Sequence, residues 1–113
     1  MINARFVSFL IALFAVLLAV SPAFADDTEF ALVIKDHRFQ PAELAVPAGK
    51  KIKVKVQNQD STPEEFESHE LKREKVIPAN STATINIGPL KAGRYPFVGE
   101  YNEKTAQGVI VAQ

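Results

Sequence analysis

The residues of this chain best suited to chemistry are carboxylates gathered in two short segments. Residues 64–70 read EEFESHE and carry five carboxylate or imidazole side chains that can bind a metal, and residues 100–103 read EYNE. If the first segment is extended, Glu65, Glu67 and His69 project from one face, because side chains alternate along a strand. Carboxylates on one face repel each other, and a bound cation would relieve that repulsion. The pattern therefore predicts a metal site.

An acidic edge that only faces solvent explains the same charges. Runs of charge usually mark a solvated surface, and charged side chains also protect an edge strand from pairing with a neighbouring molecule. If a metal binds, carboxylate and imidazole donors favour iron, manganese or Cu(II) over Cu(I), which prefers sulfur. The residues alone leave both interpretations open.

Composition excludes several other kinds of site. The 113 residues include no Cys, so no thiolate can bind a metal, and 13 basic against 13 acidic residues argue against a nucleic-acid partner. The two histidines are His37, which we expect in a surface turn, and His69. The chain has no nucleophile elbow, phosphate-binding loop or dinucleotide motif. A hydrolase or a nucleotide-dependent enzyme is therefore not expected.

The first 25 residues are predicted to be a cleaved signal peptide. One basic residue, Arg5, precedes an apolar run over residues 6–20, and the small residues Ala23 and Ala25 match the A-x-A cleavage pattern. The apolar core of about 15 residues is shorter than the roughly 20 that a membrane-spanning helix needs. We therefore expect residues 1–25 to be removed on export, and residues 26–113 to form one small domain.

The elements that must position the acidic residues are predicted to be short strands. Turn signals rich in Pro, Gly, Asn and Asp recur at short intervals, and runs such as residues 51–57 alternate between lysine and apolar side chains. This pattern predicts an antiparallel β-sandwich or barrel of seven to eight strands. The expected strands lie near residues 29–35, 42–46, 51–57, 65–71, 83–87, 93–98 and 108–112. Residues 64–75 are charged enough to begin a short helix instead.

Several motifs in this order resemble the cupredoxin family. They are Phe39-x-Pro41, Val46-Pro47-Ala48-Gly49, Asn58-x-Asp60 and Gly93-x-Tyr95-x-Phe97. More narrowly, residues 63–68, 73–77, 99–100 and 105–108 are similar to small periplasmic cupredoxin partners of Ftr-type iron permeases and to the cupredoxin domain of Efe-type iron importers. The resemblance implies a Greek-key β-sandwich in the periplasm that works in iron uptake and binds copper.

The resemblance also implies which residues can bind a metal. In blue-copper relatives, a His stands where this chain has Glu64 and a Cys where it has Gly99, and the last loop here offers neither His nor Met, so a type 1 copper site cannot form. The E-[FW]-E element of the iron-uptake relatives maps onto Glu65-Phe66-Glu67, and those relatives carry His where this chain has Asn102. If Phe66 enters the core, Glu64 turns inward with it and Glu65 and Glu67 share the opposite face.

We therefore expect a metal site formed by Glu65 and Glu67, with Glu100 as third ligand and His69 as fourth. The metal is expected to be Cu(II) or iron, as Fe(II) or Fe(III). The protein would then be a periplasmic accessory that aids ferrous oxidation or delivers iron to an iron permease or another component of the uptake system. It would meet the membrane only through the signal peptide or that permease.

The alternative is a metal-free module that docks on a transporter through its acidic loop. An independent oxidase is a weaker interpretation, because a small domain without a blue-copper site has no evident electron acceptor.

Overall fold

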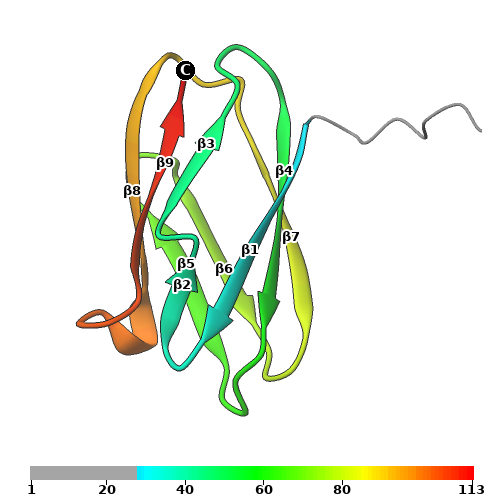
Figure 1. Cartoon of the computed structure of the whole chain (residues 1–113), viewed down its shortest axis with the longest axis vertical. Coiled ribbons are helices and arrows are strands. Elements are labelled where there is room, and N and C mark those ends of the chain that lie inside the picture. The colour runs from blue at the N-terminus through cyan, green and yellow to red at the C-terminus, as the bar shows by residue number, and fades with distance from the viewer. Residues whose placement is uncertain (1–27) are drawn as a thin grey trace, which may run out of the picture.

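Strands form where apolar and polar residues alternate. In β4 (Ile52–Asn58) every second residue is buried, and the lysines between them face outward. The computed structural model describes residues 28–113, which fold into two packed β-sheets (Figure 1). The predicted signal peptide, residues 1–25, lies outside the described residues. Within the described part, no helix has the length and hydropathy that a membrane span requires.

The first sheet has the strand order β2-β1-β4-β7, and the second has the order β3-β9-β8-β5-β6. The nine strands of residues 28–113 are β1 (Glu29–Lys35), β2 (Arg38–Gln40), β3 (Glu43–Val46), β4 (Ile52–Asn58), β5 (Glu64–Ser68), β6 (Arg73–Ile77), β7 (Thr82–Ile87), β8 (Gly93–Gly99) and β9 (Gln107–Ala112). One short 3-10 turn, η1 (Glu100–Asn102), joins β8 to β9. The predicted all-β sandwich is confirmed.

Two details of the fold differ from the expected purely antiparallel arrangement of seven to eight strands. The pairs β1/β4 and β3/β9 are parallel, because the chain crosses between the sheets. The strands without a clear sequence signal are β2, which has only three residues, and β6, in which four of five residues are exposed. The helix considered for residues 64–75 is wrong, because β5 and β6 pair as an antiparallel hairpin there.

Three phenylalanines form the aromatic part of the core. Phe66 stacks on Phe97 with ring centroids 4.8 Å apart, and Phe39 meets Phe97 edge-on at 4.9 Å. Their exposed fractions are all 4% or less. Because Phe66 belongs to β5 and Phe97 to β8, this contact holds β5, which carries acidic residues, against the strand that leads into Glu100.

Asn58 and Asp60 organise one end of the sandwich, where η1, the β1–β2 turn and the β4–β5 loop lie together (Figure 1). Asn58 is buried, and its Nδ2 donates to the carbonyl oxygens of Thr62 at 2.8 Å and Ile77 at 3.1 Å. The carboxylate of Asp60 accepts the backbone N–H groups of Asp36 and His37 at 2.8 and 3.0 Å. The Asn-x-Asp motif therefore holds the β1–β2 turn and the β4–β5 loop together through hydrogen bonds. His37 lies in an exposed turn, as expected.

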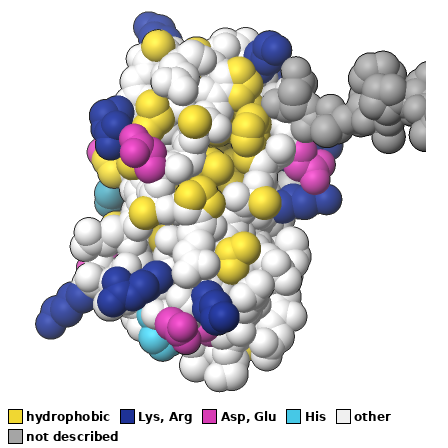
Figure 2. Space-filling model, in the orientation of Figure 1, with side chains coloured by type: hydrophobic (Ala, Val, Ile, Leu, Met, Phe, Trp, Pro, Cys, Tyr) yellow, Lys and Arg dark blue, Asp and Glu magenta, His cyan; other side chains and the backbone are white. Residues whose placement is uncertain are grey.

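The face shown in Figure 2 carries charges of both signs around scattered apolar side chains. The structure therefore shows no broad basic surface on this face, in keeping with the balanced charge of the sequence.

Candidate metal centre

Strand β5 separates its acidic residues onto two faces. Glu64, Phe66 and Ser68 are buried, while Glu65 and Glu67 are half-buried on the opposite face. Phe66 enters the core with no exposed surface, so the alternation along the strand determines where the glutamates point. The sequence prediction that Glu65 and Glu67 share one face is confirmed.

The pairing of β5 with its neighbours brings two further carboxylates to that face. In the β5–β6 hairpin, Glu67 stands opposite Glu74. On the other side, the ladder between β5 and β8 ends with Phe66 opposite Gly99, and the same register continued by one residue sets Glu65 opposite Glu100. The geometry therefore gathers glutamates from β5, β6 and η1.

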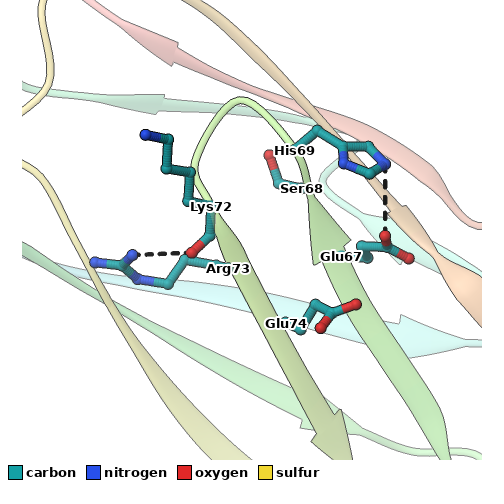
Figure 3. Close-up of a pocket in the computed structure, with 6 residues that line it drawn as sticks. All are labelled: Glu67, Ser68, His69, Lys72, Arg73 and Glu74. Atoms are coloured by element: carbon teal, nitrogen blue, oxygen red, sulfur yellow. Dashed lines mark hydrogen bonds and ion pairs between the residues drawn. The ribbon is translucent and has the colours of Figure 1, made fainter.

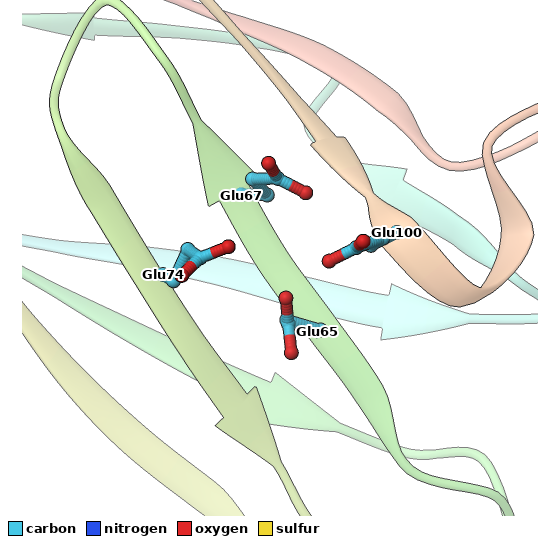
Figure 4. Close-up of side chains that lie close together, drawn as sticks. All are labelled: Glu65, Glu67, Glu74 and Glu100. Carbon is cyan, nitrogen blue, oxygen red and sulfur yellow. The ribbon is translucent and has the colours of Figure 1, made fainter.

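Four carboxylates meet in the space between these elements (Figure 4). One side-chain oxygen from each of Glu65, Glu67, Glu74 and Glu100 lies within 4.8 Å of the other three. We call this group the glutamate cluster. Like charges directly opposite each other in a sheet are destabilising, so the arrangement is one that a cation would stabilise.

The structure brings together three of the four residues that the sequence analysis proposed as ligands, and the fourth lies outside the group. Glu65, Glu67 and Glu100 belong to the cluster, whereas His69 lies in the turn after β5, because the strand ends at Ser68. The His69 side chain is 91% exposed, and its Nε2 lies 3.5 Å from Oε1 of Glu67 (Figure 3). His69 thus contacts the cluster from the outside.

Glu74 is the member that the sequence analysis missed. The signal that could have found it is the hairpin itself: residues 69–72 form the turn, so residues 67 and 74 must pair. A hollow of about 380 Å³ lies at this turn, lined by Glu67, Ser68, His69, Lys72, Arg73 and Glu74 (Figure 3).

Hydrogen bonds between carboxyl groups link Glu65 and Glu67 to Glu100. The hydrogen bond with Glu100 is the main cause that raises the pKa of Glu65 from 4.5 to about 7, with loss of solvent and the charges of Glu100, Glu74 and Glu67 adding to it. A second hydrogen bond, between Glu67 and Glu100, is the main cause that raises the pKa of Glu67. The pKa of Glu100 is lowered, because its carboxylate accepts hydrogen bonds from Glu65 and Glu67. Around pH 7 the proton on Glu65 is held weakly, so a cation that binds the cluster can displace it into solvent.

Tyr101 borders the cluster. Partial loss of solvent raises the pKa of its phenol, and the nearby negative charges of Glu65 and Glu100 raise it further. Tyr101 as a whole residue is 52% exposed. The phenol is therefore held in its neutral form beside the carboxylates.

At Gly99, the position where blue-copper relatives carry a cysteine, the space for a side chain is filled by other protein atoms. A Cβ added to Gly99 would lie 2.6 Å from Cδ of Glu64 and 2.6 Å from Cβ of Ala106. Position 99 thus has no room for a side chain. A metal held by the glutamate cluster would have carboxylate oxygens as its donors, which suit hard or borderline cations rather than Cu(I).

Comparison with known proteins identifies the class. Residues 8–112 match the family described as the cupredoxin-like domain. The chain therefore belongs to the cupredoxin-like domain family, as the motifs around Asn58 and Tyr95 indicated.

One curated relative is an uncharacterised protein of Rickettsia prowazekii (strain Madrid E), which is 43% identical over 83 residues. The match covers 74% of this chain and 66% of that relative, so the chain spans slightly less than two thirds of the relative's length.

Solved structures with the same fold include copper proteins. Auracyanin A, a blue copper protein from Chloroflexus aurantiacus, has a TM-score of 0.62 at 16% identity, over 75% of this chain and 98% of auracyanin. The metal-binding domain of a Cu(I)-exporting P-type ATPase of Streptococcus pneumoniae, solved with Cu(I), has a TM-score of 0.65 at 15% identity, over 80% of this chain and 92% of that domain. At these identities the likeness shows the fold, and the function must be argued from the site.

Proposed function

We propose that this protein is a periplasmic metal-binding accessory of iron uptake, which holds Cu(II) or iron in the glutamate cluster. The observation that carries the proposal is the convergence of Glu65, Glu67, Glu74 and Glu100 from three elements to within 4.8 Å. The cluster lies on the outer face of a sheet, where Glu74 and Glu100 are exposed. A cation held there would be open to exchange with a partner.

The donor set supports a hard or borderline cation. Carboxylate oxygens bind Fe(III) more strongly than Fe(II), and they suit Cu(II) better than Cu(I). A carboxylate site therefore lowers the iron potential and makes ferrous oxidation easier. The one electron that Fe(II) loses would pass to an acceptor outside this chain, such as dioxygen or a redox-active metal of a partner, so the protein is proposed as an accessory and not as an independent oxidase.

The proposal of iron uptake rests on where the narrow sequence resemblance falls in the fold. The segments similar to partners of Ftr-type and Efe-type systems are β5, β6, the end of β8 with η1, and the start of β9. These are the elements that carry or support the glutamate cluster. A resemblance concentrated at a site supports a shared use of that site, which here would be delivery of iron to a permease.

A metal-free docking module is the second candidate. The two large apolar side chains most exposed among residues 28–113 are Val76 (44%) and Tyr101 (52%). Val76 stands opposite Glu65, and Tyr101 directly follows Glu100. Apolar side chains around an acidic centre favour a partner with basic and apolar groups.

An uptake experiment tests the proposal and separates the two candidates. A strain lacking the protein is complemented with the wild type, with Glu65→Gln/Glu67→Gln, or with the control Glu29→Gln/Glu43→Gln. The control residues carry only surface ion pairs, with Lys55 and Arg94, which contribute little. We expect the wild type and the control to restore uptake of radioactive iron, and the cluster variant to fail at equal periplasmic level.

Restored uptake by the cluster variant would contradict a role of the cluster. Failed uptake, together with purified wild-type protein that takes up neither Cu(II) nor Fe(III), would instead favour the docking module.

A further inference from the structure

Glu64 is a buried carboxylate that the proposed metal site does not use. Its exposed fraction is 1%, and it faces the core side of β5, opposite Glu65 and Glu67. Burying a carboxylate is costly unless it is hydrogen-bonded. Three N–H groups supply those bonds: Oε1 accepts from the backbone of Glu65 at 3.0 Å and of Tyr101 at 2.9 Å, and Oε2 accepts from Nδ2 of Asn102 at 2.7 Å.

These bonds join the two elements that carry the cluster. The backbone ladder between β5 and β8 ends at the pair Phe66 and Gly99, just before Glu65 and Glu100. Beyond that point, the Glu64 side chain provides the connection from β5 to the backbone of η1. The rest of the loop is closed on itself by bonds such as Ala106 N to Asn102 O at 2.8 Å.

A single oxygen therefore sets the spacing of two cluster residues. Oε1 of Glu64 binds the amide of Glu65 itself and the amide directly after Glu100. The backbone at Glu65 and the backbone just after Glu100 are therefore both held by Oε1 of Glu64. Gly99 makes this possible, because a side chain there would overlap the Glu64 carboxyl group.

We propose that Glu64 is a positioning residue, which presets the separation of Glu65 and Glu100 for the cation without binding it. This inference rests on the proposed metal-binding function. The physical reason is preorganisation: hydrogen bonds that fix the ligands reduce the ordering that binding would otherwise require. Loss of such supporting bonds typically weakens metal affinity about 10- to 100-fold.

The test compares Cu(II) affinity, by calorimetric titration of the purified protein, in wild type, Glu64→Leu and Glu64→Gln. Leu fills the space but accepts no hydrogen bond, so we expect the affinity to fall about tenfold or more. Gln keeps one oxygen for the two amides, and Asn102 can turn its own amide to accept from the new NH₂ group. We therefore expect Gln to retain affinity within about threefold of the wild type.

Ile85→Ala is the control for a purely structural effect. Ile85 is buried in β7 of the other sheet, so its truncation lowers the free energy of unfolding without touching η1. We expect the Cu(II) affinity of this variant to equal that of the wild type while the protein is folded. If Glu64→Leu does not fold, Glu64→Asp replaces it, because the shorter side chain withdraws the shared oxygen and keeps the charge.

The outcomes separate the two claims. Wild-type protein that binds Cu(II) with an affinity unchanged in folded Glu64→Leu or Glu64→Asp overturns the positioning role alone. An equal loss in Ile85→Ala overturns it as well, because the effect would then reflect stability. Wild-type protein that binds no Cu(II) overturns both the positioning role and Cu(II) binding by the cluster.

Discussion

Replacing Gly99 by Ala tests how tightly the end of β8 is packed against the buried Glu64. The added Cβ would lie 2.6 Å from Cβ of Ala106 and 2.8 Å from Oε2 of Glu64. Carbon atoms rest about 3.5–4.0 Å apart, so the neighbours must move by about an ångström. Ala106 has no exposed surface, and Glu64 is held by three hydrogen bonds, so neither yields easily.

The expected loss is that of an overpacked core, about 1–3 kcal/mol in the free energy of unfolding. For a domain of this size, each kcal/mol lowers Tm by roughly 4–8 °C, so a fall of about 10 °C is expected. The backbone contributes no penalty, since Gly99 has φ −88°. Displacing the Glu64 carboxylate should also weaken Cu(II) binding.

Gly93→Ala is the matched control, because Gly93 begins the same strand and the nearest atom to its added Cβ is 3.8 Å away. We expect this variant to be neutral, or more stable by about 0.4–1 kcal/mol through the reduced freedom of the unfolded chain. Thermal unfolding followed by circular dichroism measures both variants. Equal Tm values for Gly99→Ala and Gly93→Ala would refute the packing argument.

Three further predictions concern the charged groups. Without metal, the free energy of unfolding should fall as pH rises from about 4.5 to about 7, because the raised pKa of Glu65 lets the folded state keep a proton that the unfolded state has released. Thermal unfolding measured across this pH range checks the prediction. The variant Glu65→Gln should show a weaker dependence of Tm on pH. Glu74→Gln should raise the Tm of the metal-free protein and lower its metal affinity, since Glu74 faces Glu67 directly; a lower Tm without metal would argue against repulsion. Asp60→Ala should lower the free energy of unfolding in urea by roughly 1–3 kcal/mol, because the amides of Asp36 and His37 lose their acceptors. An unchanged urea midpoint would contradict a structural role of Asp60.

The part of the site that could be predicted from the sequence depends on one aromatic residue. If Phe66 enters the core, the alternation of a strand assigns Glu65 and Glu67 to the other face, and the structure does bury Phe66. Glu100 was expected beside them from the resemblance to cupredoxins, and the register between β5 and β8 places it there. The alternation along the strand and the resemblance to cupredoxins were therefore sufficient to place Glu65, Glu67 and Glu100 near one another.

The remaining features depend on pairing that a local pattern does not reveal. Strand β6 has four exposed residues out of five, so it lacks the alternation that indicates a strand, and Glu74 was missed with it. His69 was assigned by counting alternate residues past Ser68, where the strand has already turned. The role of Glu64 as a link to η1 depends on its hydrogen bonds with Tyr101 and Asn102, which follow it in the sequence by 37 and 38 positions.

The most direct test of the central claim is calorimetric titration of the purified protein with Cu(II) and with chelated Fe(III) at neutral pH. For at least one of these metals we predict a single site per chain, with affinity reduced at least about tenfold in Glu65→Gln/Glu67→Gln and unchanged in Glu29→Gln/Glu43→Gln. Wild-type protein that binds neither metal, or a cluster variant that binds as tightly as the wild type, would contradict the account.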